Sequence, residues 1–350
     1  MKVGFVCRFP PEKDGIGETY VHLVNELRKS INVVTIGTRK SGSDYRINLE
    51  SFSLKKKLAE IVRKESLDAL HIQYIAPFYG KFTLNINLLN ALNLKIPIVT
   101  TLHEVQYSLN GLKKKILCSI EKRIIKKSDV ITVHTPMQGE FLSKKYAAKN
   151  IECVYMGICQ KELHPRRKNN ILFFGILSKL KGLDYLIDAM KSLPECNLRI
   201  VCSMPDKSLA EYRDYLQGRI NTEKISNIEL VSREWFTQEE KHSHYQWADV
   251  VALPYVWGDY QSAVMTDAVA YGLPVIVTKV GAIWEMAERF KCGAIINTEN
   301  SDEISNGIKL VFADYDKYRK GILEYRKVAD WKSISKRYIQ IYNIVDQQDN

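Results

Sequence analysis

The sequence has no apolar run long enough to cross a membrane, and its cysteines are not clustered. The start, MKVGFVCRFP, brings an arginine and a proline directly after a short apolar run, which is not the pattern of a signal peptide. The seven cysteines are scattered and form no Cys-x-x-Cys pair. A zinc site or a disulfide framework is therefore not expected, and buried thiols in a reducing cytoplasm are the simplest interpretation.

Acidic residues are scarce relative to basic ones, with 40 Asp and Glu against 51 Lys and Arg. The net charge of +11 and a pI of about 9.1 indicate a polyanionic partner. Nucleic acid, an anionic membrane surface and a phosphorylated small substrate would all meet this requirement. The sequence has no helix-turn-helix, stacking-aromatic or zinc signature, so nucleic acid is not expected as the partner.

What the sequence does contain is an alternation of strand-like and helix-like segments over 350 residues. The apolar periodicity is lost at 157–170, which we interpret as a linker. On each side of it the pattern predicts a doubly wound α/β domain, with a ligand crevice between the two. We expect strands at 2–7, 69–73, 96–101, 129–133, 152–155, 171–174, 198–202, 227–231, 249–253 and 275–278. We expect helices at 18–27, 54–63, 84–92, 110–127 and 209–216, from 183 and 238, and in the tail from 301, including 331–345.

The first strand passes into the first helix through Gly15-Ile16-Gly17. Glycines at such a turn let the backbone approach a phosphate or a sugar, and they are equally typical of a plain tight turn. The full Gly-x-Gly-x-x-Gly spacing is missing, and no acidic residue follows the next strand-like run in the manner that binds a ribose. A nicotinamide-dependent dehydrogenase is therefore disfavoured.

A histidine, His103, stands where the strand at 96–101 meets its loop, at the edge of the sheet where open α/β sheets bind ligands. It could hydrogen-bond a substrate hydroxyl or move a proton. His71 and His134 also fall in or next to strand-like runs, where a histidine is more often structural. We favour His103 because it meets the loop directly.

The expected helix at 110–127 carries seven basic residues and one acidic residue. Ile116, Ile120 and Ile124 share one face of it. An ordinary domain helix with its apolar face buried explains this pattern, and so does a basic amphipathic surface that contacts anionic lipid. The density of positive charge leaves a peripheral position at the inner membrane face open.

The stretch from Tyr255 to Glu285 reads as a polar loop, a helix that opens near Ser262, a Gly-Leu-Pro break and a buried strand. A helix that begins just past the carboxyl end of a strand presents backbone N–H groups and a positive dipole end to anions. Two carboxylates bracket this helix start: Asp259 lies in the loop and Asp267 lies inside the helix.

A glycine loop, Gly175-Ile176-Leu177-Ser178-Lys179-Leu180-Lys181-Gly182, follows the first strand of the second half and leads into a helix. In that place Lys181 could neutralise a diphosphate beside a helix N-terminus. Asp314-Tyr315-Asp316 formally matches an Asp-x-Asp metal motif. It falls in the helical tail without a preceding strand, so we interpret it as solvated charge and expect no metal site.

Taken together, these motifs resemble the retaining glycosyltransferases of family four, which have the GT-B architecture of two Rossmann-like domains facing a central cleft. The resemblance covers nearly the whole chain. It implies an N-terminal acceptor domain at 1–160, a C-terminal nucleotide-sugar donor domain at 161–330, and a final helix at 331–350 that could pack back on the first domain. The implied reaction transfers a sugar from a nucleotide sugar to a glycan or lipid-linked acceptor, with retention of configuration and without a metal or another cofactor.

The resemblance also implies roles for single residues. Lys181, beside Gly175, would hold the diphosphate, and His103 would bind the transferred sugar. Asp259 and Asp267 match the family's Glu-x7-Glu motif, the first facing the sugar and the second the ribose. Gly15 and Gly17 would approach the donor phosphate or the acceptor. The backbone amides of the helix start would bind the diphosphate; they belong to Gln261, Ser262 and Ala263.

Four positions depart from the family pattern. Ile176 replaces a usual arginine, aspartates replace both glutamates, and Gly281-Ala282 replaces a glycine pair. Loss of one charge-assisted contact costs about 1.5–3 kcal/mol unless another group replaces it. The candidate replacements are Arg8, Lys179 and Arg233. Two alternatives stay open: a non-catalytic binding protein with this fold, and a nucleotide-sugar epimerase, for which we identify no additional catalytic carboxylates.

Overall fold

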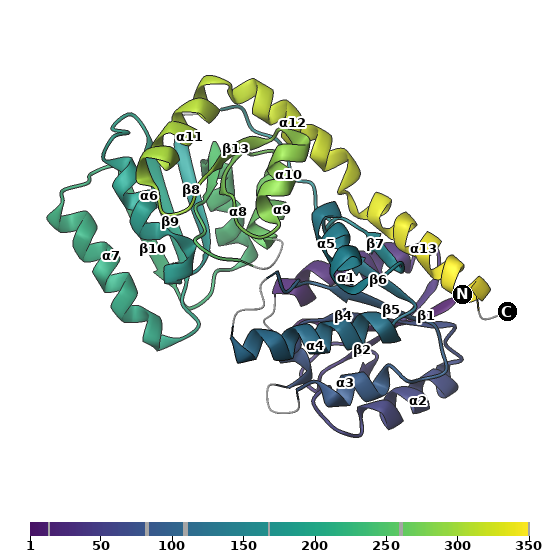
Figure 1. Cartoon of the computed structure of the whole chain (residues 1–350). Helices are drawn as coiled ribbons and strands as arrows, with labels where there is room; N and C mark the ends of the chain where they lie inside the picture. Colours follow the sequence, from purple (N-terminus) through teal and green to yellow (C-terminus); the bar gives the residue numbers. More distant parts are fainter. Residues whose placement is uncertain (13–14, 81–83, 108–110, 167–168, 259–261, 349–350) are drawn as a thin grey trace. The chain divides into compact units, whose positions relative to one another are not determined.

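The computed structural model describes residues 1–12, 15–80, 84–107, 111–166, 169–258 and 262–348 (Figure 1). The chain divides into two compact units. Unit 1 consists of Met1–Gly157 together with Ala329–Asn350, and unit 2 consists of Ile158–Val328. Each unit has its own parallel sheet, so each is described by itself.

The sheet of unit 1 has seven strands in the order β3-β2-β1-β4-β5-β6-β7. All its neighbouring strands pair in parallel. The central strands β1, β4, β5 and β6 are buried almost throughout, which a parallel sheet covered on both faces requires. The strands are β1 (Lys2–Val6), β2 (Asn32–Gly37), β3 (Tyr45–Arg46), β4 (Ala69–Tyr74), β5 (Ile98–Leu102), β6 (Val130–Val133) and β7 (Ile151–Cys153).

Most helices of unit 1 bury one apolar stripe. In α2, for example, Leu54, Leu58 and Ile61 are buried at helical spacing, and the lysines between them face outward. The helical segments are α1 (Gly15–Leu27), α2 (Leu54–Glu65), η1 (Ala76–Tyr79), α3 (Ile86–Ala91), α4 (Leu112–Lys127), α5 (Pro136–Tyr146) and α13 (Trp331–Gln348).

The sheet of unit 2 has six parallel strands in the order β10-β9-β8-β11-β12-β13. Its strands are β8 (Asn170–Ile176), β9 (Asn197–Ser203), β10 (Ile228–Arg233), β11 (Val250–Leu253), β12 (Val275–Thr278) and β13 (Gly293–Ile296). Its helical segments are η2 (Lys179–Lys181), α6 (Leu183–Met190), η3 (Lys207–Leu209), α7 (Ala210–Thr222), α8 (Gln238–Trp247), α9 (Ala263–Tyr271), α10 (Ile283–Phe290), α11 (Ser301–Ala313) and α12 (Tyr315–Val328).

The order of strands reverses once in each sheet, between β1 and β4 in unit 1 and between β8 and β11 in unit 2. Because crossovers are right-handed, the helices that connect strands on one side of this point cover one face of the sheet, and those on the other side cover the opposite face. Ligands of doubly wound sheets bind at the carboxyl ends of the strands there. The expectation of two Rossmann-like doubly wound domains is confirmed.

The last helix, α13, belongs to unit 1 and packs against α1 and β4 (Figure 1). Its Tyr338 and Tyr342 are almost completely buried. The Tyr342 hydroxyl lies 2.6 Å from Nδ1 of His71 on β4. The chain therefore returns to its first sheet after completing the second, and it does so through polar contacts in the core.

Several boundaries differ from those expected from the sequence. The helix expected at 84–92 is shorter, Ile86–Ala91, and the helix expected at 110–127 begins at Leu112, with Asn110 outside the described residues. Helices α5 and α10 and strands β3 and β13 were not predicted. Helix α5 has little apolar periodicity, but a capping box between Thr135 and Gln138 fixes its start.

Candidate functional site

The glycine loop of unit 2 is held against the end of β11. Gly182 has φ +68°, and a Cβ added there would lie 1.9 Å from the carbonyl oxygen of Pro254. The backbone N–H of Val256 donates to the carbonyl of Leu180 at 2.9 Å. Only glycine fits this approach without strain, and the approach fixes the loop across the point where the strand order reverses.

Lys181, in the same loop, lies over an aromatic ring. Its Nζ is 3.5 Å from the centroid of the Tyr255 ring, a cation–π contact. Burial lowers the pKa of Lys181 to about 8. A lysine with that pKa is still mostly charged at neutral pH, and its charge is poorly solvated. An anionic ligand that compensated the charge of Lys181 would therefore bind favourably at this position.

The start of α9 is linked to the same tyrosine. Ser262, the N-cap residue, is buried, and its Oγ lies 3.2 Å from the Tyr255 hydroxyl. The Ser262 side chain makes no capping hydrogen bond to the helix. The backbone of Tyr255 is fixed by Thr278 of β12, whose hydroxyl donates to the Tyr255 carbonyl at 2.5 Å. Lys181 and Ser262, both predicted site residues, therefore meet at Tyr255.

The remaining predicted residues of unit 2 that the structure describes belong to β8 and α9. Gly175 is the second-last residue of β8, and Ala263 is the exposed first residue of α9. Asp267 is in α9, where its carboxylate pairs with Lys241 at 2.7 Å and accepts from the Tyr245 hydroxyl at 3.4 Å. Burial raises the pKa of Asp267, and the Lys241 ammonium opposes that rise. Asp259 and Gln261 lie outside the described residues.

In unit 1, the glycine pair opens α1. Gly15 is its exposed first residue. Gly17 is buried, and a Cβ added there would lie 2.0 Å from the carbonyl oxygen of Arg8. Glycine is thus required at position 17 because the helix lies against the protein's own backbone just after β1.

His103, the other predicted residue of unit 1, is only 5% exposed and belongs to a buried polar chain. Its Nε2 lies 2.8 Å from Oε1 of Gln73, and its Nδ1 lies 3.2 Å from Nε2 of His134. His71 continues the chain from Gln73, at 3.0 Å. Burial, with a smaller contribution from His134 and His71, holds the pKa of His103 well below its usual range. His103 is therefore neutral, and a sugar hydroxyl that hydrogen-bonds it must replace a protein partner.

The three cations considered as replacements for the missing arginine have other contacts. The Arg8 guanidinium stacks on Phe78 at 4.3 Å. Arg233 pairs with Glu240 at 3.0 Å. Lys179 lies 5.8 Å from the centroid of the Tyr212 ring. Ile176, where the arginine is usual, is 47% exposed.

Sequence reasoning did not single out the residues that connect the site, namely Tyr255, Thr278, Gln73 and Tyr20. Tyr20 of α1 packs edge-on against His103, with ring centroids 5.4 Å apart. The available signal was position, because Tyr255 and Gln73 lie at the carboxyl ends of strands. Their partners, however, are distant in sequence, so the pattern along the chain did not identify them.

Two kinds of feature are absent from the described residues. No group of three or more His, Cys, Asp or Glu side chains is placed to hold a metal ion there. Asp314, in the Asp-x-Asp sequence, is exposed at the end of α11 and pairs with Lys317 at 3.4 Å. Within the same described ranges, none of the helices combines the length and the apolar character needed to cross a bilayer.

Comparison with known proteins gives two family matches and several relatives. The model described as "Glycosyltransferase Family 4" matches residues 2–160, and the model described as "Glycosyl transferases group 1" matches residues 158–328. An uncharacterized glycosyltransferase of Methanocaldococcus jannaschii is 30% identical over 50% of this chain and 44% of its own. An uncharacterized protein of the cps region of Klebsiella pneumoniae is 25% identical over 55% and 54%. The match thus spans about half the length of these relatives.

The fold is also found among solved structures. The crystal structure of the HepE protein of Anabaena in complex with UDP-glucose superimposes with a TM-score of 0.73, at 14% identity, over 98% of this chain and 99% of that one. At this identity the likeness concerns the fold, which is the GT-B arrangement of two Rossmann-like domains. Together with the two family matches, which cover residues 2–328, it shows that the chain belongs to the family 4 glycosyltransferases.

Proposed function

We propose that this protein is a retaining glycosyltransferase that moves a sugar from a nucleoside diphosphate sugar to a glycan or lipid-linked acceptor, without a metal ion. The observation that carries the proposal is the meeting of Lys181 and Ser262 at Tyr255. It brings a poorly solvated ammonium group and the start of a helix together at the strand-order reversal of unit 2. That is the chemistry that binds a diphosphate.

The other predicted residues receive roles in the same scheme. The donor is held by Gly175, Lys181, Asp267 and the amides of residues 261–263, and Asp259 faces the transferred sugar. A nucleotide donor agrees with the UDP-glucose bound to the HepE protein. In unit 1, His103 binds the transferred sugar, with Gly15 and Gly17 near the donor phosphate or the acceptor. The acceptor itself binds at the loops of unit 1.

The chemistry is electrostatic. The bond between the anomeric carbon and the diphosphate oxygen breaks, and negative charge develops on the departing diphosphate. Lys181 and the amides at the start of α9 stabilise that charge where it forms. The acceptor oxygen bonds to the anomeric carbon on the same face, and its proton passes to the leaving phosphate oxygen. No protein nucleophile is required.

Calorimetric titration with UDP, GDP and ADP, followed by transfer and hydrolysis assays on the corresponding sugars, tests the proposal. Lys181→Ala is expected to weaken binding of the preferred nucleotide about tenfold or more, because it removes a charge-assisted contact. Lys309→Ala, an exposed lysine of α11, is the matched control and should bind normally. If neither the wild type nor Lys181→Ala transfers a sugar from any donor, the non-catalytic alternative remains.

We place the protein at the cytoplasmic face of the membrane, bound to anionic lipid through α4. The one acidic residue of α4, Glu121, is buried and accepts from Gln106 N–H at 2.9 Å and the Tyr146 hydroxyl at 2.7 Å. The exposed charged residues of α4 are therefore all basic, and the helix also exposes Ser119 and 76% of Leu112. The exposed basic residues are Lys113, Lys115, Lys122, Arg123 and Lys126.

Flotation with liposomes that contain phosphatidylserine tests this placement. The double variant Lys113→Glu/Lys115→Glu is expected to lose binding, since each basic residue near an anionic surface contributes about 1 kcal/mol. Lys309→Glu/Lys320→Glu, with the same change of charge at exposed positions of unit 2, should float like wild type. Equal flotation of both double variants and wild type would remove the lipid proposal and leave the transfer reaction untouched.

A further inference from the structure

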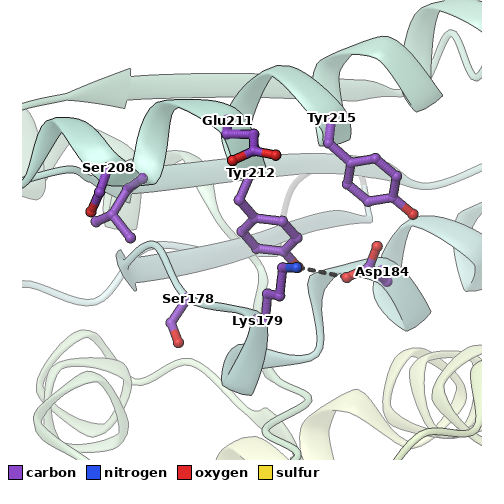
Figure 2. A pocket seen from close by; sticks show the side chains of 8 residues that line it. Ser178, Lys179, Asp184, Ser208, Glu211, Tyr212 and Tyr215 are labelled. Atoms are coloured by element: carbon purple, nitrogen blue, oxygen red, sulfur yellow. Dashed lines mark hydrogen bonds between the residues drawn. The ribbon is translucent and has the colours of Figure 1, made fainter.

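Unit 2 contains an open pocket of about 650 Å³. None of the residues predicted to be catalytic or to bind the donor lines it, but Lys179, a candidate replacement for the missing arginine, does. The pocket lies where the turn before α6 and the first turn of α6 face η3 and the beginning of α7, and its lining comes from these segments (Figure 2). Its volume is within the range of small-molecule sites, about 300–1,000 Å³.

Two lysines of one short turn point in different directions, one toward the predicted donor site and the other toward the pocket. Lys181 lies over the ring of Tyr255, which follows β11, and Lys179 lies toward the ring of Tyr212 on α7. Lys179 lines the pocket and Lys181 does not. The turn thus presents one cation to each of two different places.

One wall of the pocket is aromatic. Tyr212 and Tyr215 are one helical turn apart on α7 and their rings are stacked, with centroids 6.1 Å apart and planes inclined by 16°. The Tyr212 hydroxyl donates to Asp184 at 2.6 Å, which fixes that ring (Figure 2). Tyr215 is 52% exposed. The exposed ring of Tyr215 thus stacks on the fixed ring of Tyr212, and together they offer a flat surface against which the C–H face of a sugar ring can pack.

The other walls carry groups that hydrogen-bond hydroxyls. Glu211 offers carboxylate oxygens, Ser178 and Ser208 offer hydroxyls, and Lys179 offers an ammonium group. Figure 2 shows Glu211 above the Tyr212 ring and both serines on the side of Tyr212 away from Tyr215. An aromatic wall combined with a small number of convergent polar groups is the usual composition of a specific ligand site.

The charge of the pocket favours a neutral ligand. It contains two carboxylates, Asp184 and Glu211, and one ammonium group, Lys179. Asp184 is paired with Arg219 at 3.7 Å, so Lys179 and Glu211 leave the pocket without the excess of positive charge that favours a nucleoside diphosphate. A neutral saccharide would use the same groups as hydrogen-bond acceptors and donors. We propose that the pocket is a second carbohydrate site, which holds a neutral saccharide unit beside the donor site. This inference depends on the proposed function in one respect, namely that the saccharide unit belongs to a glycan bound by the same enzyme.

Titration of the full chain with maltopentaose, cellopentaose and mannopentaose, and separately with UDP, GDP and ADP, tests the proposal. At least one oligosaccharide is expected to bind wild type. Tyr215→Ala should weaken that binding about tenfold, because the exposed part of the aromatic wall is lost, and should leave nucleotide affinity unchanged. Tyr215→Phe, which keeps the ring, should bind like wild type.

Three results would overturn the proposal: none of the oligosaccharides binds wild type, Tyr215→Ala binds as tightly as wild type, or Tyr215→Ala loses nucleotide affinity instead. The last result would assign the pocket to the nucleotide. Saccharide binding that depends on Tyr215, with no binding of any nucleotide, would support this site while the proposed transfer reaction fails. The two proposals can therefore be separated.

Discussion

The ammonium nitrogen of Lys181 lies 3.5 Å from the centre of the Tyr255 ring, so that a residue of the glycine loop is fixed to the segment that follows β11. Tyr255 in turn contacts Ser262 at the start of α9. This arrangement joins the two segments that the sequence indicated separately. It also determines how the site should respond to pH and to substitution.

Nucleotide affinity is expected to fall as pH rises above about 8. Burial lowers the pKa of Lys181 to about 8, and a bound diphosphate stabilises the charged form, so binding requires the proton. Affinity should fall about twofold between pH 7 and 8 and then by up to about tenfold per pH unit. Calorimetry with UDP from pH 7 to 9.5 measures this. Lys181→Arg keeps its charge and should show a level profile; a level profile for wild type would exclude Lys181 as the titrating group.

Gly182→Ala is expected to destabilise unit 2 and weaken nucleotide binding. The added Cβ would combine a positive φ with an approach of 1.9 Å to the Pro254 carbonyl, which costs about 2 kcal/mol or more. Gly218→Ala in α7 is the control. Its Cβ meets no described atom within 4 Å beyond the helix backbone, and it should stabilise by about 0.5–1 kcal/mol. Urea unfolding gives both values, and equal midpoints for the two variants would contradict the tight contact at Gly182.

Unit 1 is expected to lose stability in mild acid. Burial lowers the pKa of His71 to about 3 and that of His134 to about 4. The unfolded chain therefore takes up protons below about pH 6.5 that the folded chain refuses. Stability is complete above that pH and falls by about 1.4 kcal/mol per pH unit for each histidine as pH drops toward 4.

Unfolding at pH 7 and pH 5, followed by hydrogen exchange of peptides from unit 1, measures this loss. His22→Gln alters an exposed histidine of α1 and should leave the slope unchanged. A free energy of unfolding that is the same at both pH values would mean that the buried histidines are already protonated in the fold.

Tyr342→Phe should loosen α13 from the sheet of unit 1. It removes the hydroxyl that lies 2.6 Å from His71 Nδ1, and it leaves that buried nitrogen without its partner, at a cost of about 1–3 kcal/mol. Faster hydrogen exchange in α13 and β4 is the expected readout. Asn343→Ala, at the exposed position next to it, serves as the control. Exchange that is equally slow in both variants would show that the apolar contacts alone fix α13.

The alternation of strands and helices was sufficient to predict two doubly wound domains, because fully buried parallel strands and one-sided helices have different periods along the chain. Helices α5 and α10 were not predicted because neither has a long pattern of this kind. Helix α5 buries only Gln138 and Leu142, and α10 has eight residues, so neither provides a long apolar pattern. The start of α5 depends on its capping box, whereas α10 has no side-chain cap and depends on the sheet it covers.

Some features of the candidate site could likewise be predicted from the sequence, and others could not. Lys181 and Ser262 could be predicted because each follows a strand at the carboxyl edge of the sheet, a position that the chain order alone defines. The carboxylate of Asp267 was expected to face the ribose, and its pairing with Lys241 at 2.7 Å comes from a different helix, α8. Likewise, Gln73 and His134, which hold both ring nitrogens of His103, come from β4 and the segment after β6.

The sequence by itself thus determined the family, the two sheets and the edge of each sheet where ligands bind, since these follow from periodicity and from motifs within short segments. Only the tertiary structure decided which side chains meet there: Tyr255 under Lys181, Tyr342 against His71, and the two tyrosines of α7 across from Lys179. Such contacts join residues far apart in the chain. They depend on the packing of whole elements, which no local pattern encodes.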